Sequence, residues 1–464
     1  MHTSSEPQAA WGRVRSVFLG SSGRSRLARA ISWNIAGGAT SRIVTVAGSY
    51  VVARCLGEKG FGQLGMVINT FTMLGVFASF GLGMTATRFI SIWRTSAPER
   101  AGRIAAFAPI LAATFALAGM GFVLAEAPWL ARAALNAPDL VFVLRLAAPL
   151  LLLGALQDVA QGILAGAESF RALARVSAMA GLALALGMMI GAVSFGLPGS
   201  ILGMVIGMSL GCALSLTTAW WELKRLDIPV RWTKWRSELP TLWSFALPAA
   251  LSGSVVIPVT WLANAILVHQ PGGYDQMGVF NAANQWRNLI LYVPTLVASA
   301  GLPVLANLWQ TAGGSEYLRV LRLKMGLGFV GALAVAVPVM LAAPFIMKGY
   351  GRGFSQGTDI LIVLAGAAVI LATLTMVGQA LVSEGRMWTG FLLNCVWAAV
   401  LLVLAMRWVP AHGALGLAWA NLGAFGVHFV TVSGYFWWSC RTQRRTTNRA
   451  GIPSPVPPPP STDV

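Results

Sequence analysis

Long apolar stretches separated by short polar segments fill this chain almost from end to end. A helix needs about 20 apolar residues to cross the hydrocarbon core of a bilayer. The stretches are continuous and lack the alternation of a membrane strand, which indicates helices rather than a barrel. We therefore expect about twelve transmembrane helices, at residues 31–53, 62–87, 104–125, 139–164, 173–195, 199–221, 240–268, 277–305, 325–345, 358–382, 388–408 and 413–438.

The short segments between these stretches are alternately basic and nearly uncharged. Of the 33 Lys and Arg residues, 24 lie in or beside the two tails and every second loop, 7 lie in or beside the opposite loops, and the other 2, Arg42 and Arg287, lie well inside predicted spans. Cytoplasmic loops of membrane proteins carry such an excess of Lys and Arg. The pattern predicts a bacterial inner-membrane protein with both termini in the cytoplasm, as an even number of spans requires.

Composition agrees with an all-α polytopic membrane protein. Hydrophobic residues make up 56% of the chain, charged residues only 10%, and the mean hydropathy is +0.70. A soluble domain carries about 25% charged residues. The net charge of +18 is largely the orientation signal, with some affinity for anionic headgroups. Because the cations are scattered among loops rather than gathered on one face, we expect no nucleic-acid partner.

Motifs for enzymatic and metal chemistry are missing from the sequence. It contains no Walker A motif and no CxxC pair, so we expect no cofactor, no metal site and no ATP hydrolysis. The four cysteines and four histidines are isolated in the sequence: Cys55, Cys212, Cys395, Cys440, His2, His269, His412 and His428.

Two pairs of segments suggest that the chain repeats itself. Phe61-Gly62 at the start of the second span is echoed by Met277-Gly278 at the start of the eighth, 216 residues later, and Gln161 is echoed by Gln379, 218 residues later. Two six-helix halves in parallel form a transporter architecture with its substrate site between the lobes. We expect a basic tail (1–30), an N-lobe (31–221), a cytoplasmic linker (222–239), a C-lobe (240–439) and a Pro-rich tail (440–464).

Two segments resemble a known family. Leu56-Gly57-Glu58-Lys59-Gly60-Phe61-Gly62 and Gly81-Leu82-Gly83-Met84-Thr85-Ala86-Thr87-Arg88 are similar to those of the Wzx-type oligosaccharide-lipid flippases. These belong to the multidrug/oligosaccharidyl-lipid/polysaccharide (MOP) exporter superfamily. The resemblance implies two six-helix lobes around a central cavity that opens alternately to either side. It also implies a cargo of polyprenyl-pyrophosphate-linked sugar units.

The first span carries a cation that suits such a cargo. Arg42 lies near its middle, and a charge there costs at least about 2.5–3.5 kcal/mol. Arginine holds phosphate groups bidentately. We expect Arg42 to bind the pyrophosphate, although helix carbonyls or Asp158 could instead hold it as a buried structural cation. It flanks a face of small and polar residues that suits a wet cavity or a tight helix contact: Asn34, Gly38, Ser41, Thr45 and Ser49.

The eighth span carries a run of amides on one helical face. Amides and phenols can bind sugars without strict specificity, and they would be costly facing lipid. Hydrogen bonding between helices is the alternative role for them. Arg287 lies about a third of a turn from this face and could reach the cavity or pair with another helix. The polar face consists of Asn281, Asn284, Gln285, Asn288 and Tyr292.

Three further charges complete the candidates. Asp158 lies inside the fourth span, where a carboxylate could carry a coupled proton or cation. A salt bridge to Arg42 or a cap on a neighbouring helix is the alternative. Arg88 and Arg54 lie at span ends and could act as gate or interfacial residues.

Three functions compete at this point. The first is a flippase for lipid-linked saccharides in O-antigen or exopolysaccharide assembly, whose expected neighbours are a polysaccharide polymerase and export machinery. The second is a cation-coupled drug or metabolite exporter of the same superfamily, which the shortage of membrane carboxylates disfavours. The third is a saccharide polymerase or ligase, which would need a larger periplasmic loop than this chain has.

Overall fold

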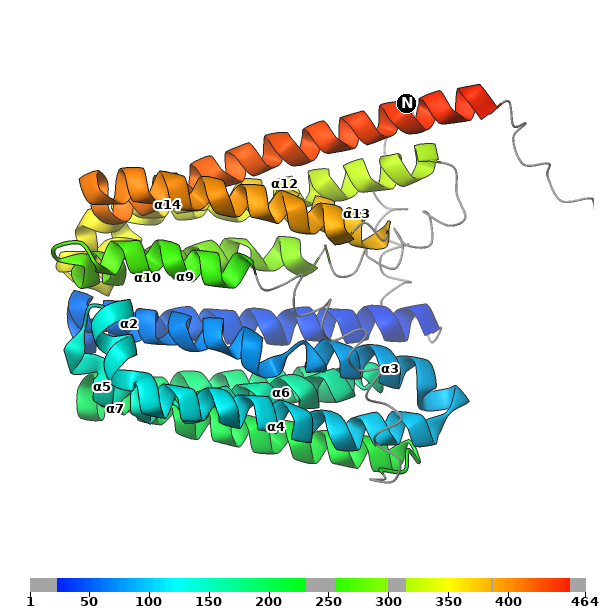
Figure 1. Cartoon of the computed structure of the whole chain (residues 1–464), viewed down its shortest axis with the longest axis horizontal. Helices are drawn as coiled ribbons and strands as arrows, with labels where there is room; N and C mark the ends of the chain where they lie inside the picture. The colour runs from blue at the N-terminus through cyan, green and yellow to red at the C-terminus, as the bar shows by residue number, and fades with distance from the viewer. Residues whose placement is uncertain (1–22, 231–254, 297, 299–313, 385–386, 451–464) are drawn as a thin grey trace, which may run out of the picture.

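The computed structural model describes residues 23–230, 255–296, 298, 314–384 and 387–450, and the secondary structure in these residues is helical. Two lobes lie one above the other in Figure 1. The N-lobe contains α2 (Gly23–Ser79), α3 (Leu82–Ser96), α4 (Pro98–Trp129), η1 (Leu130–Ala134), η2 (Pro138–Leu140), α5 (Val141–Ala147), α6 (Pro149–Gly166) and α7 (Phe170–Arg225). The C-lobe contains α9 (Val256–Val268), α10 (Gly273–Ile290), α12 (Gly314–Tyr350), η4 (Gly353–Gly357), α13 (Thr358–Ser383) and α14 (Met387–Ala450).

Three of the helices contain two membrane crossings each. In α2, α7 and α14 the chain reverses at Gly57, Gly196 and Gly413, whose φ angles are 68°, 62° and 56°. Glycine adopts this left-handed region without a steric penalty, so it can end one helix just before the next begins. With these reversals each of the twelve predicted spans has a helical counterpart. The spans at 240–268 and 277–305 extend beyond the described parts of the chain.

Seven helices in the described chain are long and apolar enough to cross a membrane. Together with the reversals and the two lobes, they confirm the prediction of an all-α polytopic membrane protein. The expectation of one uninterrupted helix over 62–87 is wrong, because the chain breaks between α2 and α3. Phe80 and Gly81 there have φ angles of 46° and 67°. Hydropathy predicts the span but does not report this local change of backbone direction.

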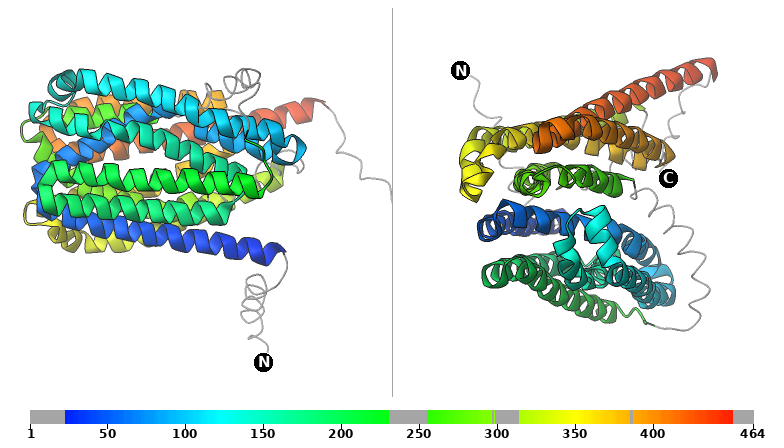
Figure 2. Two further views of the ribbon diagram at one scale, coloured as in Figure 1. Left: turned by 90° about the horizontal axis from the view of Figure 1, so that it is seen from below. Right: turned by 60° about the vertical axis from the view of Figure 1, so that its left-hand side comes forward.

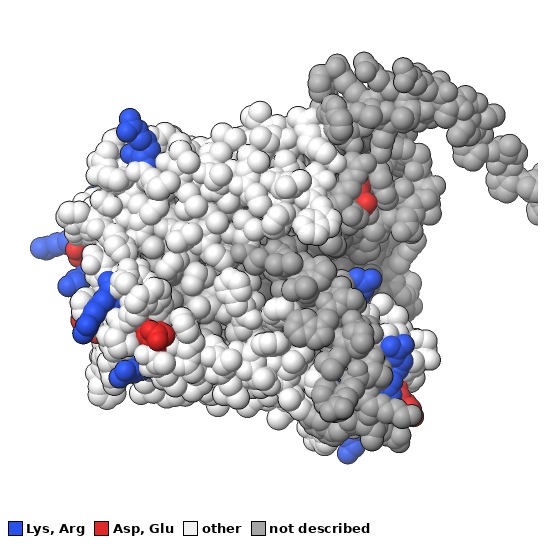
Figure 3. Space-filling model, in the orientation of Figure 1, with Lys and Arg blue, Asp and Glu red and all other residues white. Residues whose placement is uncertain are grey.

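Charged side chains gather at the two ends of the bundle. We call the end that contains the reversals at Gly57, Gly196 and Gly413 the turn end; it lies at the left in Figure 1. The opposite end, which contains Arg94 and Arg171, is called the basic end. Charged atoms gather at the two ends of the face shown in Figure 3, and an uncharged band lies between them. This band has the character expected of a surface in contact with lipid.

The apolar core joins the lobes only along part of the bundle. A large cluster crosses from Phe61 and Leu64 of α2 to Met277 and Phe280 of α10. A second cluster lies within the N-lobe, among α3, α4, α6 and α7, and a third lies within the C-lobe around Tyr317. The right-hand view in Figure 2 shows the lobes as two layers. The described lobes are thus joined near the turn end and have separate cores toward the basic end.

The two arms of α7 pack without side chains between them. Gly187 lies against Gly203, and Gly191 lies against Gly199; a Cβ atom at any of the four would collide with the opposing backbone. At the basic end the arms are joined by Ser169 Oγ, which donates a hydrogen bond of 2.9 Å to Glu222 Oε2. Small residues allow membrane helices this close approach. The hairpin therefore forms a tightly packed unit of the N-lobe.

Candidate functional site

The lobes meet through a reciprocal contact between α2 and α10. A Cβ atom at Gly62 would collide with the carbonyl oxygen of Tyr274, and one at Gly278 would collide with that of Glu58. Each carbonyl lies four residues before the glycine on its own helix, and the two glycines are the pair that the sequence repeat identified. A contact in which each element uses the same surface is the signature of a two-fold relation. The two lobes are related in this way at their interface.

An aromatic cluster closes the interface at the turn end. We use this name for Tyr50 and Phe61 of α2, Tyr350 of α12, and Phe354 of η4. The rings of Tyr50 and Tyr350 stack with centroids 3.9 Å apart, and Phe61 lies 6.4 Å from Tyr350 and 6.1 Å from Phe354. The hydroxyl groups of Ser49 and Tyr350 share a hydrogen bond of 2.9 Å. Tyr350 is completely buried, so this cluster excludes water between the lobes.

Three further hydrogen bonds join the lobes. Arg54 Nε donates to the carbonyl oxygen of Gly349 at 2.8 Å, and the Tyr274 hydroxyl donates to that of Leu135 at 2.6 Å. Burial, and to a lesser degree the carboxylate of Asp139, raises the pKa of Tyr274 above its ordinary value, which keeps this hydroxyl protonated. Farther along α2, Trp261 Nε1 donates to Thr70 Oγ1 at 2.9 Å. Arg54 therefore contributes to the contact between the lobes.

The polar face of α10 becomes more exposed with distance from the turn end. Asn281 is 8% exposed and lies over the Cα atom of Gly65, while Asn284 and Gln285 are half-buried and Asn288 is exposed. Tyr292, one turn farther on, is half-buried. The face thus starts in the closed part of the interface and continues toward the end where the lobes have separate cores.

Buried polar atoms without a hydrogen-bond partner are confined to the C-lobe within the described part of the chain. They include Asn281 Nδ2, Asn284 Oδ1 and Arg287 Nε on α10, Gln379 Oε1 on α13, and His428 Nδ1 on α14. An unpaired buried donor or acceptor costs about 1–3 kcal/mol. Arg287 itself is half-buried and forms no ion pair with a described residue. Such atoms can accept ligand hydrogen bonds or donate them without breaking existing ones.

Asp158 lies at the break between α2 and α3. Its carboxylate lies against Gly83 and accepts a hydrogen bond from the backbone of that residue, in the first turn of α3. The N-cap residue of α3, Gly81, makes no side-chain cap. A carboxylate at this position satisfies otherwise unpaired N–H groups and complements the helix dipole. Asp158 is also exposed, so its role as a helix cap leaves it accessible.

The structure describes the side chains of only some of the remaining predicted site residues. Asn34, Ser41 and Arg42 belong to α2, but their side chains lie outside the described residues. Thr45 is half-buried. Arg88 is exposed on α3, with its guanidinium 5.9 Å from the ring centre of Phe89.

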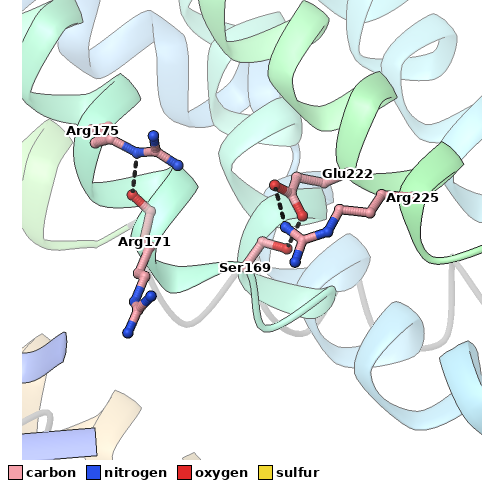
Figure 4. A network of polar contacts seen from close by, with 5 residues as sticks. All are labelled: Ser169, Arg171, Arg175, Glu222 and Arg225. Carbon is pink, nitrogen blue, oxygen red and sulfur yellow. Dashed lines mark hydrogen bonds and ion pairs between the residues drawn. The ribbon is translucent and has the colours of Figure 1, made fainter. Parts of the chain in front are cut away.

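At the basic end, the following polar contacts between described residues each stay within the N-lobe. Arg94 and Glu168 form an ion pair of 2.6 Å between α3 and the segment after α6. In Figure 4, Glu222 binds Ser169 and Arg225, while the guanidinium of Arg171 points away from this group. Among the described residues no group of three or more His, Cys, Asp or Glu could hold a metal ion.

The sequence did not identify the residues that close the turn end. The chain has only six tyrosines, and Tyr50, Tyr274 and Tyr350 all lie at the lobe contact. The position of such rare aromatic residues at span ends was a usable signal in the sequence. The sequence could not show that Tyr50 and Tyr350, 300 residues apart, stack on each other, because that contact depends on the docking of the two lobes.

Comparison with known proteins identifies the family. Residues 27–309, more than half of the chain, match the family Polysacc_synt, described as "Polysaccharide biosynthesis protein". The chain belongs to this polysaccharide biosynthesis family. The Wzx-type resemblance seen in the sequence is thereby confirmed.

Two relatives and one solved structure are similar to this member of the polysaccharide biosynthesis family over most of its length. It is 27% identical over 380 residues to the EPS I polysaccharide export inner membrane protein EpsE of Ralstonia nicotianae, covering 79% of this chain and 84% of EpsE. It is 24% identical over 435 residues to the lipid III flippase of Escherichia coli, covering 88% and 98% of the two chains. An inward-facing multidrug resistance MATE family transporter of the MOP superfamily has the same fold, with a TM-score of 0.72, 16% identity, and coverage of 89% and 96%.

Proposed function

We propose that this protein is a flippase that moves polyprenyl-pyrophosphate-linked oligosaccharide units across the bacterial inner membrane by alternating access. The units would serve O-antigen or exopolysaccharide assembly. The observation that carries the proposal is the polar face of α10, which runs from the closed lobe contact at Asn281 to the exposed Asn288. A lobe interface with exposed amides and buried unpaired donors is suited to a polar headgroup. Relatives that export polysaccharide or flip a lipid support the same cargo class.

The distribution of Lys and Arg indicates how the protein is oriented in the membrane during the transport cycle. We propose that the basic end faces the cytoplasm, with both termini there, since most Lys and Arg residues lie on that side. The described lobes are closed at the turn end and would then receive cargo from the cytoplasmic leaflet. Residues 31–221 and 240–439 would move as the two lobes, joined by the linker 222–239. A polymerase that consumes the flipped units is the expected neighbour.

The residue roles follow from cargo chemistry. Arg42 and Arg287 would neutralise the pyrophosphate, because a bidentate guanidinium fits phosphate oxygens. The polar face of α10 and the stripe of α2 that includes Asn34, Ser41 and Thr45 would contact the sugar. Asp158 would cap α3 and is the first candidate for a coupled ion. Arg88 and Arg54 would act as gate residues at opposite ends.

A cation-coupled exporter of drugs or metabolites is the second candidate, favoured by the fold shared with the MATE transporter. Such a protein needs carboxylates along its path to bind cations. Asp158 is the only acid that we place well inside a predicted span. A polymerase or ligase is a weaker candidate still, because the connections at the turn end are short. The family relatives are transporters, and we assign no catalytic residue.

Translocation in proteoliposomes tests the proposal. A fluorescent polyprenyl-pyrophosphate oligosaccharide should be moved by the wild type, and Arg42→Ala should slow it about tenfold or more, equivalent to at least 1.4 kcal/mol. Arg42→Lys should restore part of the rate if charge matters more than bidentate geometry. Arg145→Ala, an exposed arginine on α5, is the matched control and should not change it. A folded wild type that moves no lipid-linked sugar, but exports small cations under an ion gradient, would establish the exporter instead.

A further inference from the structure

The C-lobe contains an apolar pocket that the lobe interface does not use. It has a volume of about 490 Å³, within the range of roughly 300–1,000 Å³ typical of small-molecule sites. Because α13 packs against both α12 and α14, it forms the floor of the pocket between those two helices. All three helices line it: Met325, Gly326 and Phe329 of α12, Ile370 and Thr373 of α13, and Gly426 and Phe429 of α14.

The pocket offers almost nothing to a polar ligand. The hydroxyl of Thr373, its one polar side chain, already donates to the carbonyl oxygen of Val369 at 3.3 Å. Gly326 and Gly426 have open space where a Cβ atom would stand, so side chains do not fill the hollow from either wall. The lining residues belong to helical segments that are apolar enough to span a membrane. A hydrocarbon chain is therefore the ligand that fits.

Two cations lie on the pocket-lining face of α12. Arg319, Arg322, Gly326 and Phe329 fall within about 80° of one another in helical projection. Both arginines are exposed, lie on the basic-end side of the pocket, and form no ion pair with a described residue. The same helix face thus presents an apolar pocket and two guanidinium groups, about one turn (Arg322) and two turns (Arg319) from Gly326. This combination suits an amphiphile with an anionic head and an apolar chain.

We propose that this pocket binds the isoprenoid chain of the lipid-linked cargo, and that Arg319 and Arg322 bind its pyrophosphate before the cargo enters the lobe interface. The inference rests on the proposed flippase function. Two guanidinium groups match the two phosphoryl groups of a pyrophosphate, whereas a phospholipid phosphodiester offers only one. The arrangement places a loading site at the basic end, beside the interface rather than inside it.

Photo-crosslinking tests the site directly. Protein in nanodiscs is labelled with a polyprenyl pyrophosphate that carries a diazirine on its chain and no sugar, and labelled peptides are mapped. We expect labels on α12 and α14 around Gly326 and Gly426. Gly326→Leu and Gly426→Leu fill the pocket and should lower labelling about tenfold, while Gly121→Leu, at an open glycine on α4, should not.

Further labelling experiments test whether the two arginines recognise the pyrophosphate, and whether the bound lipid is cargo or a membrane phospholipid. Arg319→Gln combined with Arg322→Gln should weaken labelling by the pyrophosphate but not by the corresponding neutral prenol. Excess phosphatidylglycerol should compete poorly. Equal labelling of Gly426→Leu and Gly121→Leu would overturn the pocket, and equal competition by phosphatidylglycerol would overturn its assignment to cargo. Wild type that flips lipid-linked sugar without labelling the pocket would refute this inference alone, whereas labelling without flipping would refute the function.

Discussion

At the turn end the lobes meet through stacked rings and backbone contact, whereas at the basic end the ion pairs and hydrogen bonds described above each stay within one lobe. The aromatic cluster joins α2 to α12 and η4, and Gly62 and Gly278 bring α2 and α10 together. The pairs Arg94–Glu168 and Ser169–Glu222 hold only the N-lobe. Alternating access requires the first set of contacts to break while the second persists. Contacts between lobes and contacts within a lobe should therefore respond differently to substitution.

The largest loss of stability is expected from substitutions at the backbone contact between α2 and α10, where no side chain fits. Gly62→Val and Gly278→Val force backbone apart at the reciprocal contact and should each cost about 3 kcal/mol or more. Because the two sites are related by the two-fold, their effects should be similar. Thermal unfolding in detergent measures the stability of each variant, and the translocation assay measures its activity. Gly75→Val, on the same helix but facing open space, is the control; an equal loss there would contradict the steric explanation.

A large effect is also expected in the aromatic cluster. Tyr350→Ala removes a buried ring and should cost about 3–5 kcal/mol in the closed turn end. Tyr350→Phe keeps the ring but loses the bond to Ser49, about 0.5–1.5 kcal/mol. Distances between spin labels at Lys59 and Arg352 should lengthen in the alanine variant and stay near wild type in the phenylalanine variant. Unchanged distances in both would show that these rings do not hold the gate closed.

Asp158 should have an intermediate effect, confined to the N-lobe. Asp158→Leu removes the cap from α3 and should cost about 0.5–2 kcal/mol. Asp158→Asn retains an acceptor oxygen and should unfold near the wild-type temperature. Translocation by the asparagine variant with and without an ion gradient completes the test. Loss of the gradient response at unchanged stability would assign the carboxylate to ion coupling as well.

The smallest effect is expected at the basic end. The side chains of Arg94 and Glu168 are 27% and 51% exposed, so Glu168→Gln should cost no more than about 1 kcal/mol. Added salt should reduce that difference because it screens exposed charges. Thermal unfolding at low and high sodium chloride measures it. A cost as large as that of Tyr350→Ala would remove the distinction between the two ends.

The sequence predicts the number and class of the helices because crossing a bilayer imposes a length and an apolar composition. It also pairs Gly62 with Gly278 as matching places in the repeat, but that the two helices touch there is seen only in the structure. The break at Phe80–Gly81 escapes it, because hydropathy reports the apolar length of a segment and not a change in its backbone direction. The stacking of Tyr50 on Tyr350 escapes it as well, because only tertiary docking brings those rings together.

The candidate site is predicted only in outline. Helical periodicity places Asn281 and Asn288 on one face of α10, but their opposite degrees of exposure come from the angle between the lobes. For Asp158 the sequence leaves a cap, a salt bridge and an ion site open. The structure favours the cap, because the break in the neighbouring helix leaves N–H groups beside the carboxylate.

The close packing of the α7 hairpin has a mechanical consequence. With backbone against backbone at Gly191 and Gly199, and the arms joined again at Ser169 and Glu222, neither arm can slide or rotate without the other. The hairpin is then a rigid unit about 40 Å long, at 1.5 Å per residue. A rotation imposed on one arm is therefore passed to the other, whereas the joint at Phe80–Gly81 interrupts the path from α2 to α3.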